Sequence, residues 1–140
     1  IKMIDVYEFH PSLDGWFINT GTRHFVKFVP DVEKVNVEAD GRALRWNPEF
    51  APVGANANFV SLDPDGTLRV RTFEKGVEAE TLACGTGITA SAIAAYLSKV
   101  PAAGITKYNI QARQDRLKVE FTPEKDSFKN VYLTGPALLV

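Results

Sequence analysis

The stretch that decides the fold is TGITASAIAAYLSK, residues 86–99. It has no proline and is rich in alanine, the strongest helix former. Nearly every side of such a helix carries a small or apolar side chain, so we expect the helix to be buried rather than to lie on the surface. Small residues also let the surrounding strands approach closely. Pro101 and Gly104 follow, and they end the helix.

Most of the remaining chain reads as short strands separated by turn residues. A hairpin is predicted where the runs 58–62 and 67–74 flank Asp63-Pro64-Asp65-Gly66, because proline presets the turn and glycine supplies a positive φ. Further strands are predicted at 16–19, 24–29, 108–113, 116–121 and 131–133, and a short helix at 39–46. The sequence therefore predicts an α+β fold, a curved and mostly antiparallel sheet wrapped around one central buried helix.

The composition excludes several classes of protein. The chain has 140 residues, enough for a single domain over residues 1–140 with a proper core, and its formal charge is −1. That balance predicts neither a nucleic-acid partner nor a membrane surface, and no apolar run approaches the ~20 residues needed to cross a bilayer. One cysteine excludes a disulfide framework and a multi-cysteine zinc site, so we expect no metal. With no secretory signal, a lone cysteine fits the reducing cytoplasm.

The most informative residues lie at the start of the predicted helix, where Cys84 is followed by Gly85-Thr86-Gly87. The first turn of a helix presents backbone N–H groups without internal partners, and its dipole favours negative charge. A thiol there forms thiolate more easily, and glycine N–H groups can bind a carboxylate. Taken alone, Cys84 is as well explained as a small buried hydrophobe. Together, thiolate and carboxylate clamp describe a base aimed at the α-carbon of an amino acid.

The residues around Cys84 resemble the second cysteine motif of the diaminopimelate epimerase family. The matching segments are Glu74-Lys75-Gly76 and Glu80-Thr81-Leu82-Ala83-Cys84-Gly85-Thr86-Gly87. Gly54-Ala55-Asn56-Ala57-Asn58-Phe59-Val60 resembles the family's Asn-x-x-Phe substrate loop, and Asn19-Thr20-Gly21-Thr22-Arg23-His24 resembles its Gly-Asn-Pro-His segment. Order and approximate spacing agree for all three, and together they cover most of the chain.

The resemblance implies a pyridoxal-independent isomerase of two similar halves, each with one catalytic cysteine and no cofactor. This chain resembles the C-terminal half. It starts at Ile1 and ends on the apolar run 137–140, so we expect a fragment whose N-terminal half is missing. Thr134-Gly135-Pro136-Ala137 resembles the segment after which the family's chain returns to its first domain. The expected partners are an amino-acid substrate and the missing half, and a homodimer is left open.

The implied reaction converts LL-diaminopimelate to meso-diaminopimelate, a precursor of lysine and peptidoglycan, by a two-cysteine acid/base mechanism. Carried over by motif, Cys84, Glu74 and His24 are the catalytic residues, the last two positioning the thiols or tuning their protonation. The substrate-binding residues are Asn56, Lys75, Gly85, Thr86 and Thr22. Glu74 also suits the distal ammonium of the substrate. With a single thiol, the isolated chain is expected to be inactive.

The sequence departs from the family pattern in three places. Lys75 replaces an arginine, and it cannot reproduce a bidentate guanidinium grip on a carboxylate. Thr22 and Arg23 replace the Asn-Pro of the Gly-Asn-Pro-His segment. One extra residue lies between Gly76 and Glu80. The first two departures concern recognition of the substrate's distal groups, and Arg23 is a candidate to replace some of the lost positive charge.

Other functions remain open at this point. Proline racemases and hydroxyproline epimerases also use a Cys-Gly-Thr-Gly segment, but the Asp-Arg-Ser-Pro that usually precedes their cysteine is absent from Glu80-Thr81-Leu82-Ala83. Phenazine-type isomerases lack the cysteine, so Cys84 argues against them. A non-catalytic amino-acid-binding module is the alternative from a different class. A cysteine hydrolase is disfavoured because it needs a paired histidine, and only His10 and His24 are available.

Overall fold

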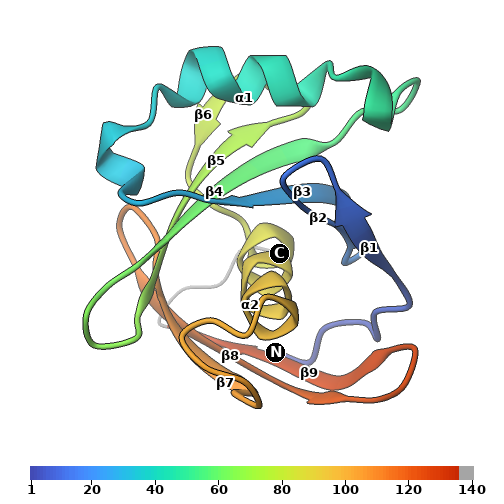
Figure 1. Ribbon diagram of the computed structural model, residues 1–140, viewed down its shortest axis with the longest axis vertical. Coiled ribbons are helices and arrows are strands. Elements are labelled where there is room, and N and C mark those ends of the chain that lie inside the picture. The colour runs from blue at the N-terminus through green and yellow to red at the C-terminus, as the bar shows by residue number, and fades with distance from the viewer. Residues whose placement is uncertain (136–140) are drawn as a thin grey trace.

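The computed structural model describes residues 1–135, so the last two residues of the Thr134–Ala137 segment lie outside the described residues. Nine strands and two α-helices make up the fold of these 135 residues (Figure 1). The strands are β1 (Glu8–Ser12), β2 (Gly15–Asn19), β3 (Arg23–Phe28), β4 (Asn56–Leu62), β5 (Leu68–Glu74), β6 (Ala79–Thr81), β7 (Lys107–Gln111), β8 (Arg116–Pro123) and β9 (Phe128–Thr134). The helices are α1 (Val37–Arg45) and α2 (Gly85–Leu97), with 3-10 turns at Val32–Lys34 and Pro48–Phe50.

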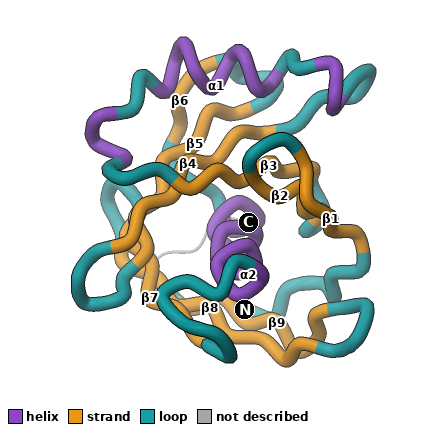
Figure 2. The backbone as a smooth tube through the Cα atoms, viewed as in Figure 1, coloured by secondary structure: helices purple, strands orange, loops and turns teal. Residues whose placement is uncertain are grey.

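The strands form one curled sheet in the order β1-β2-β3-β4-β5-β7-β8-β9, with β6 paired to β5. Two of the pairings, β3 with β4 and β5 with β7, are parallel, and the others are antiparallel. The segment before β1 pairs with β9 through the bridges Lys2↔Tyr132 and Val6↔Phe128. The two ends of the sheet therefore meet, and the sheet wraps into a barrel (Figure 2).

Helix α2 fills this barrel (Figure 1). Its residues from Gly87 to Ala95 are all buried, and Ile88 and Ile93 pack against inward-facing residues of the strands on every side. Alanine and glycine dominate these positions, which lets the strands close around the helix. The predicted α+β fold with one central buried helix is confirmed. The helix spans Gly85–Leu97 rather than 86–99, because Ser98 caps it and Lys99 adopts a positive φ of 58°.

Helix α1 covers the outer face of β4 and β5 (Figure 1). A parallel pair needs a crossover connection, and α1 lies on the crossover between β3 and β4. Beneath it, Phe59 and Phe73 form a second core with Val37. Strands β4 and β5 are therefore buried on both faces, by α2 inside and α1 outside. The predicted helix at 39–46 is confirmed, with Asn36 capping its first turn through Ala39 N–H.

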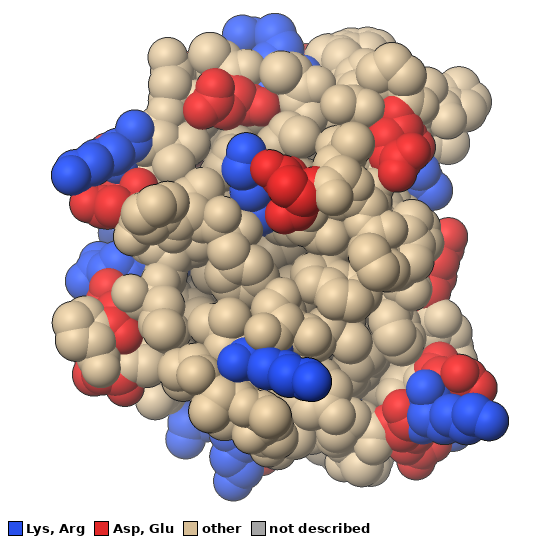
Figure 3. Space-filling model, viewed as in Figure 1, with Lys and Arg blue, Asp and Glu red and all other residues tan. Residues whose placement is uncertain are grey.

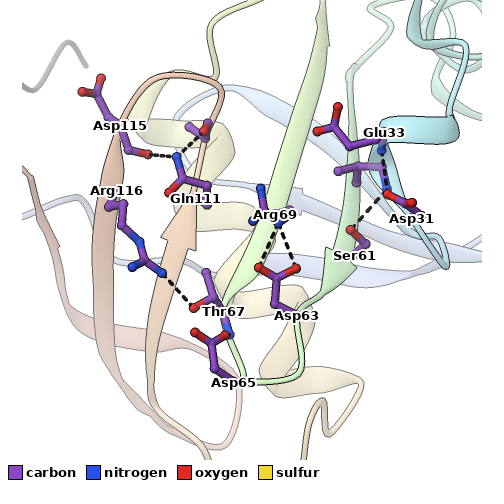
Figure 4. Close-up of polar contacts among 12 residues, drawn as sticks. Asp31, Glu33, Ser61, Asp63, Asp65, Thr67, Arg69, Gln111, Asp115 and Arg116 are labelled. Carbon is purple, nitrogen blue, oxygen red and sulfur yellow. Dashed lines mark hydrogen bonds and ion pairs between the residues drawn. The ribbon is translucent and has the colours of Figure 1, made fainter.

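The predicted β4–β5 hairpin is also confirmed, and polar side chains hold its turn to the next hairpin (Figure 4). The Arg69 guanidinium donates to the Asp63 carboxylate at 2.8 Å, and Asp65 accepts from Thr67 N–H at 2.9 Å. Arg116 of β8 donates to the Thr67 hydroxyl at 3.1 Å. The Arg116 bond joins the β4–β5 hairpin to β8, beside the short parallel pairing of β5 with β7.

The visible surface carries both signs of charge. On the face drawn in Figure 3, basic and acidic side chains are interspersed, which agrees with a formal charge of −1. Within residues 1–135, neither helix is long and apolar enough to cross a membrane.

Candidate functional site

One cavity of about 580 Å³ opens where the loop before β3, the adjoining ends of β4 and β5, and the start of α2 meet. Seven of the eight residues proposed from the sequence line it: Thr22, His24, Asn56, Glu74, Lys75, Cys84 and Thr86. The eighth, Gly85, lines a neighbouring cavity of about 270 Å³, which Glu74 and Cys84 also border. The structure therefore brings all the proposed residues to one end of the barrel.

Cys84 is the residue that caps the start of α2. Its carbonyl accepts the first helical bond, from Ile88 N–H at 3.0 Å, while its side chain makes no capping bond. The first turn has no acidic residue. The backbone N–H groups of that turn and the positive end of the helix dipole are therefore available to an anion beside the partly buried sulfur.

Two hydroxyl groups and one imidazole ring, those of Thr86, Thr22 and His24, form hydrogen bonds that lead from Cys84 to strand β3. Thr86 Oγ1 lies 3.1 Å from Cys84 Sγ, and the Thr22 hydroxyl donates to that oxygen at 3.0 Å. His24 Nε2 lies 2.8 Å from Thr22 Oγ1 and 3.1 Å from Thr86 Oγ1. Burial lowers the pKa of His24 to about 4, so the ring is neutral at pH 7. His24 can therefore orient hydroxyl groups near Cys84, but it does not supply a positive charge.

Glu74 borders both cavities together with Cys84. The Thr81 hydroxyl donates to Glu74 Oε1 at 3.1 Å. Thr81 lies on β6, three residues before Cys84, and β6 pairs with the end of β5 that carries Glu74. The short strand therefore fixes the carboxylate and the thiol relative to each other.

Asn56 ties two parts of the cavity wall together. Its Oδ1 accepts from Lys75 N–H at 2.8 Å, and its Nδ2 donates to the Arg23 carbonyl at 3.1 Å. One amide N–H and one lone pair remain for a ligand. The Arg23 side chain borders the cavity, but its guanidinium donates to the Gly54 carbonyl at 2.9 Å and lies over the Phe17 ring.

The extra residue between Gly76 and Glu80 is accommodated in a turn held against α1. Gly76 and Glu78 both adopt a positive φ, of 94° and 60°. The Glu78 carboxylate accepts from Gly76 N–H and from the Arg45 side chain at 2.8 Å. Its pKa is lowered, first by the Gly76 N–H and then by Arg45. The turn is thus anchored to α1, and β6 after it pairs with β5.

Two buried residues, Asn58 and the cavity-lining Thr72, were not proposed from the sequence. Asn58 and Thr72 are 0% and 2% exposed, and both face inward from β4 and β5. Asn58 Nδ2 lies 2.9 Å from His24 Nδ1. The available signal was the alternation in the 56–60 strand, which puts a polar amide at an inward position between apolar residues. Among residues 1–135, no cluster of His, Cys, Asp and Glu could hold a metal ion.

The comparisons with known proteins agree with this geometry. The family model described as diaminopimelate epimerase matches residues 16–140. The diaminopimelate epimerase of Aquifex aeolicus (strain VF5) is 50% identical over 125 residues, which cover 86% of this chain and 42% of the relative. That of Hydrogenobaculum sp. (strain Y04AAS1) is 41% identical over 141 residues, covering 99% and 49%. The chain thus spans about half the length of the curated relatives it matches.

Two solved structures share the fold. The Bacillus anthracis phenazine biosynthesis protein of the PhzF family superimposes with a TM-score of 0.52 at 17% identity, over 89% of this chain and 38% of that one. The PhzF family protein of Enterococcus faecalis gives a TM-score of 0.51 at 15% identity, over 86% and 40%. At this identity the likeness concerns the barrel around a central helix alone.

Proposed function

The chain belongs to the diaminopimelate epimerase family, an isomerase family, and from that premise we propose that it supplies one of the two acid/base groups that invert the α-carbon of diaminopimelate. The observation that carries the proposal is the position of Cys84. Its sulfur lies at the start of α2, in a cavity large enough for an amino acid, with Glu74 and the Thr22–His24–Thr86 hydrogen bonds around it.

The proposed reaction moves one proton off one face of the α-carbon and another onto the opposite face. In one direction, the Cys84 thiolate takes the α-proton and becomes a thiol, while the electron pair of the broken C–H bond passes to the α-carbon and its carboxylate. A thiol on the other face then gives its proton to that carbon. In the reverse direction Cys84 is the thiol that donates. The mechanism needs no cofactor, because fixed dipoles hold the charge that develops.

The first turn of α2 is suited to that electrostatic task. N–H groups of Gly85, Thr86 and Gly87 would hold the substrate's α-carboxylate as negative charge accumulates, since this turn has no acidic residue or side-chain cap. Glu74 would help to position the thiol. For the distal end of the substrate, Lys75 would face the carboxylate, and Glu74 and Asn56 are the groups suited to the ammonium.

The partner thiol would come from a second domain that precedes this one in a longer protein. The chain spans 42% and 49% of two relatives that carry the same family name, and it contains one cysteine. The cavities beside Cys84 would then close against that domain. We place the protein in the cytoplasm, where a catalytic thiol stays reduced.

The test is to follow α-deuterium exchange and stereoinversion of diaminopimelate in D₂O, with the whole protein and with residues 1–140 alone. The whole protein should be active and the isolated chain inactive. Cys84→Ala in the whole protein should lower the rate about 10²–10⁴-fold with an unchanged circular dichroism spectrum. Cys84→Ser should also be poor, because a hydroxyl is far less acidic than a thiol.

Each other outcome points to a specific error. Turnover by residues 1–140 at the rate of the whole protein would refute the division of the site between two domains. An active Cys84→Ala protein would remove Cys84 from the reaction. Inversion of proline or hydroxyproline in preference to diaminopimelate would favour the related racemases, and binding without exchange would favour an amino-acid-binding module.

A further inference from the structure

The barrel interior holds two buried polar side chains that the proposed reaction does not itself use. Asn58 on β4 and Thr72 on β5 are paired in the antiparallel register, and His24 lies on the neighbouring β3. Exposure is 0% for Asn58 and His24 and 2% for Thr72. Burying an amide or a hydroxyl is unfavourable unless it is hydrogen-bonded, and an apolar pair would fill the same space. Asn58 and Thr72 therefore contribute hydrogen bonds of defined direction, which an apolar pair would lack.

The orientation of the Asn58 amide follows from its contact with the Phe25 carbonyl oxygen. Its Nδ2 is 3.2 Å from the Phe25 carbonyl oxygen, which can only accept. Its Oδ1 is 2.8 Å from Thr72 Oγ1, which donates to it. Turning the amide over would place oxygen against the Phe25 oxygen, so the Phe25 carbonyl selects this orientation, and the Thr72 hydroxyl, which can donate or accept, donates to Oδ1 in it. The second N–H of Nδ2 then points at His24 Nδ1, 2.9 Å away.

This contact determines which nitrogen of His24 carries the proton. The ring is neutral, since burial lowers the pKa of His24 to about 4, and a neutral imidazole has one donor and one acceptor. Because Nδ1 accepts from Asn58, the proton lies on Nε2. That N–H faces Thr22 Oγ1 at 2.8 Å and Thr86 Oγ1 at 3.1 Å, so it donates to hydroxyl oxygens.

The hydroxyl groups continue in the same direction. Thr86 Oγ1 receives the Thr22 hydroxyl proton at 3.0 Å and faces the His24 N–H, so both of its lone pairs meet donors. Its own proton is left for Cys84 Sγ, at 3.1 Å. A sulfur that accepts a hydrogen bond is stabilised as thiolate, because bonds to an ionised acceptor are about twice as strong as those to a neutral one.

We propose that Asn58 and Thr72 are positioning residues, which hold His24 in the Nε2–H tautomer so that the hydrogen bonds from His24 through Thr22 and Thr86 are all donated in the direction of the Cys84 sulfur. This inference deepens the proposed epimerase function and rests on it for its meaning in catalysis. The arrangement itself can be tested without substrate. If Nδ1 carried the proton instead, Nε2 would accept from Thr22, and Thr86 would lose a donor that commits its proton to the sulfur.

The glycine after Thr86 supports the same arrangement. A Cβ on Gly87 would lie 2.8 Å from Asn58 Oδ1 and 3.2 Å from His24 Cε1. The helix can therefore approach the Asn58–His24 pair only because position 87 has no side chain. This assigns Gly87 a packing role against the polar group as well as an N–H in the first turn.

The first measurement is a two-bond ¹H–¹⁵N correlation spectrum of the whole protein, with histidine signals assigned by His24→Gln. The expected result is a proton on Nε2 and an unprotonated Nδ1 for His24 at pH 7. A protonated Nδ1 would overturn the proposal outright. A residue that only fills space would not determine the tautomer, so this readout separates positioning from packing.

The second measurement is the rate of Cys84 alkylation by iodoacetamide, followed by mass spectrometry of the peptide that contains it. Glu74, Lys75, Arg113 and Asp115 share the two cavities with Cys84, so all variants are compared at one pH. Asn58→Leu should slow alkylation about 3- to 10-fold, the effect of one hydrogen bond. Thr72→Val keeps the side-chain shape and is the test variant if Asn58→Leu does not fold. It should also slow the alkylation of Cys84.

The matched control is Ser61→Ala. Ser61 is a buried polar residue on β4, but it accepts from Val32 N–H on the face that α1 covers. Its loss should leave both the His24 tautomer and the alkylation rate unchanged. If Ser61→Ala slowed alkylation as much as Asn58→Leu, the slowing would come from general destabilisation, and the proposal would be overturned. Tautomer and alkylation results as expected, in a protein without epimerase activity, would leave the arrangement standing and refute the proposed function instead.

Discussion

Glu80→Gln is the substitution whose cost the structure defines most clearly. The Glu80 carboxylate accepts from Arg71 Nη2 at 2.6 Å and Arg71 Nε at 2.8 Å, and Arg113 lies 3.1 Å away. The side chain of Glu80 is 9% exposed and that of Arg71 is 19% exposed. An amide keeps the shape but turns an NH₂ group toward the guanidinium. Removing one partner of a fully buried pair costs about 3–5 kcal/mol, and the partial exposure here reduces the expected loss to about 2–3 kcal/mol.

The assay is urea unfolding of the whole protein, monitored by a signal from this domain, and the matched control is Glu120→Gln. Glu120 is paired with Lys107 at 3.5 Å, but the two side chains are 41% and 71% exposed, so its loss should cost less than about 1 kcal/mol. Glu80→Gln should lower the urea midpoint by roughly 1 M, taking an m-value of about 2–3 kcal/mol/M. A shift no larger than that of Glu120→Gln would refute the reasoning.

The same ion pair sets a pH dependence. Hydrogen bonding to Arg71 lowers the pKa of Glu80 from its ordinary 4.5, despite the opposing effect of burial. A carboxyl whose pKa is lower in the folded state stabilises the fold above its unfolded pKa, and loses that contribution as the pH falls through the folded value. The stability difference between wild type and Glu80→Gln should therefore be full at pH 7 and shrink below about pH 4.5. A difference that persists undiminished at low pH would contradict the assignment.

Three further predictions follow from the site. Gly87→Ala should destabilise the domain by about 1–3 kcal/mol and shift the His24 ring signals, since its Cβ would lie 2.8 Å from Asn58 Oδ1; unshifted signals would contradict the packing described. Burial lowers the pKa of His24 to about 4, so between pH 6.5 and 4 the unfolded chain binds a proton that the native state does not. The free energy of unfolding should therefore decrease by up to about 1.4 kcal/mol for each unit by which the pH is lowered through this range. His24→Gln should remove this slope in unfolding experiments. Lys75→Ala should raise KM for diaminopimelate about 10- to 150-fold, with Lys75→Arg tolerated and a short amino acid unaffected; an unchanged KM would place the distal contact elsewhere.

The elements predicted correctly are those with a strong local pattern. Helix α2 is alanine-rich and apolar on every side, and the β4–β5 hairpin has turn residues between two apolar runs. Strands β1 and β6 were not predicted. Strand β1 lies beside β2 at the end of the strand order, is mostly exposed and contains Pro11, so it shows no alternation. Strand β6 has three residues, all half-buried, and only its pairing with β5 defines it.

The parallel pairings could not be derived from local pattern either. Pairing β3 with β4 depends on α1 crossing outside the sheet, and pairing β5 with β7 depends on α2 passing through the barrel. Both parallel pairings depend on how the whole sheet closes into a barrel. For the site, the motifs identified most residues that line the cavity, but not Thr72 or the buried Asn58, because their role depends on a histidine on another strand.

Thr22 shows how a departure from a motif gains its meaning from the structure. From the sequence, replacing the family's asparagine with Thr22 pointed to altered recognition of the substrate's distal end. In the structure its hydroxyl lies between His24 Nε2 and Thr86 Oγ1, at 2.8 and 3.0 Å, and Thr86 is in contact with Cys84. A hydroxyl oxygen can accept one hydrogen bond and donate another, whereas each polar atom of an amide either donates or accepts. The substitution therefore changes the hydrogen bonds that reach the thiol, and Thr22→Val tests this: a change in the Cys84 alkylation rate would locate its effect at the thiol, and a change in KM alone would locate it at the far end of the substrate.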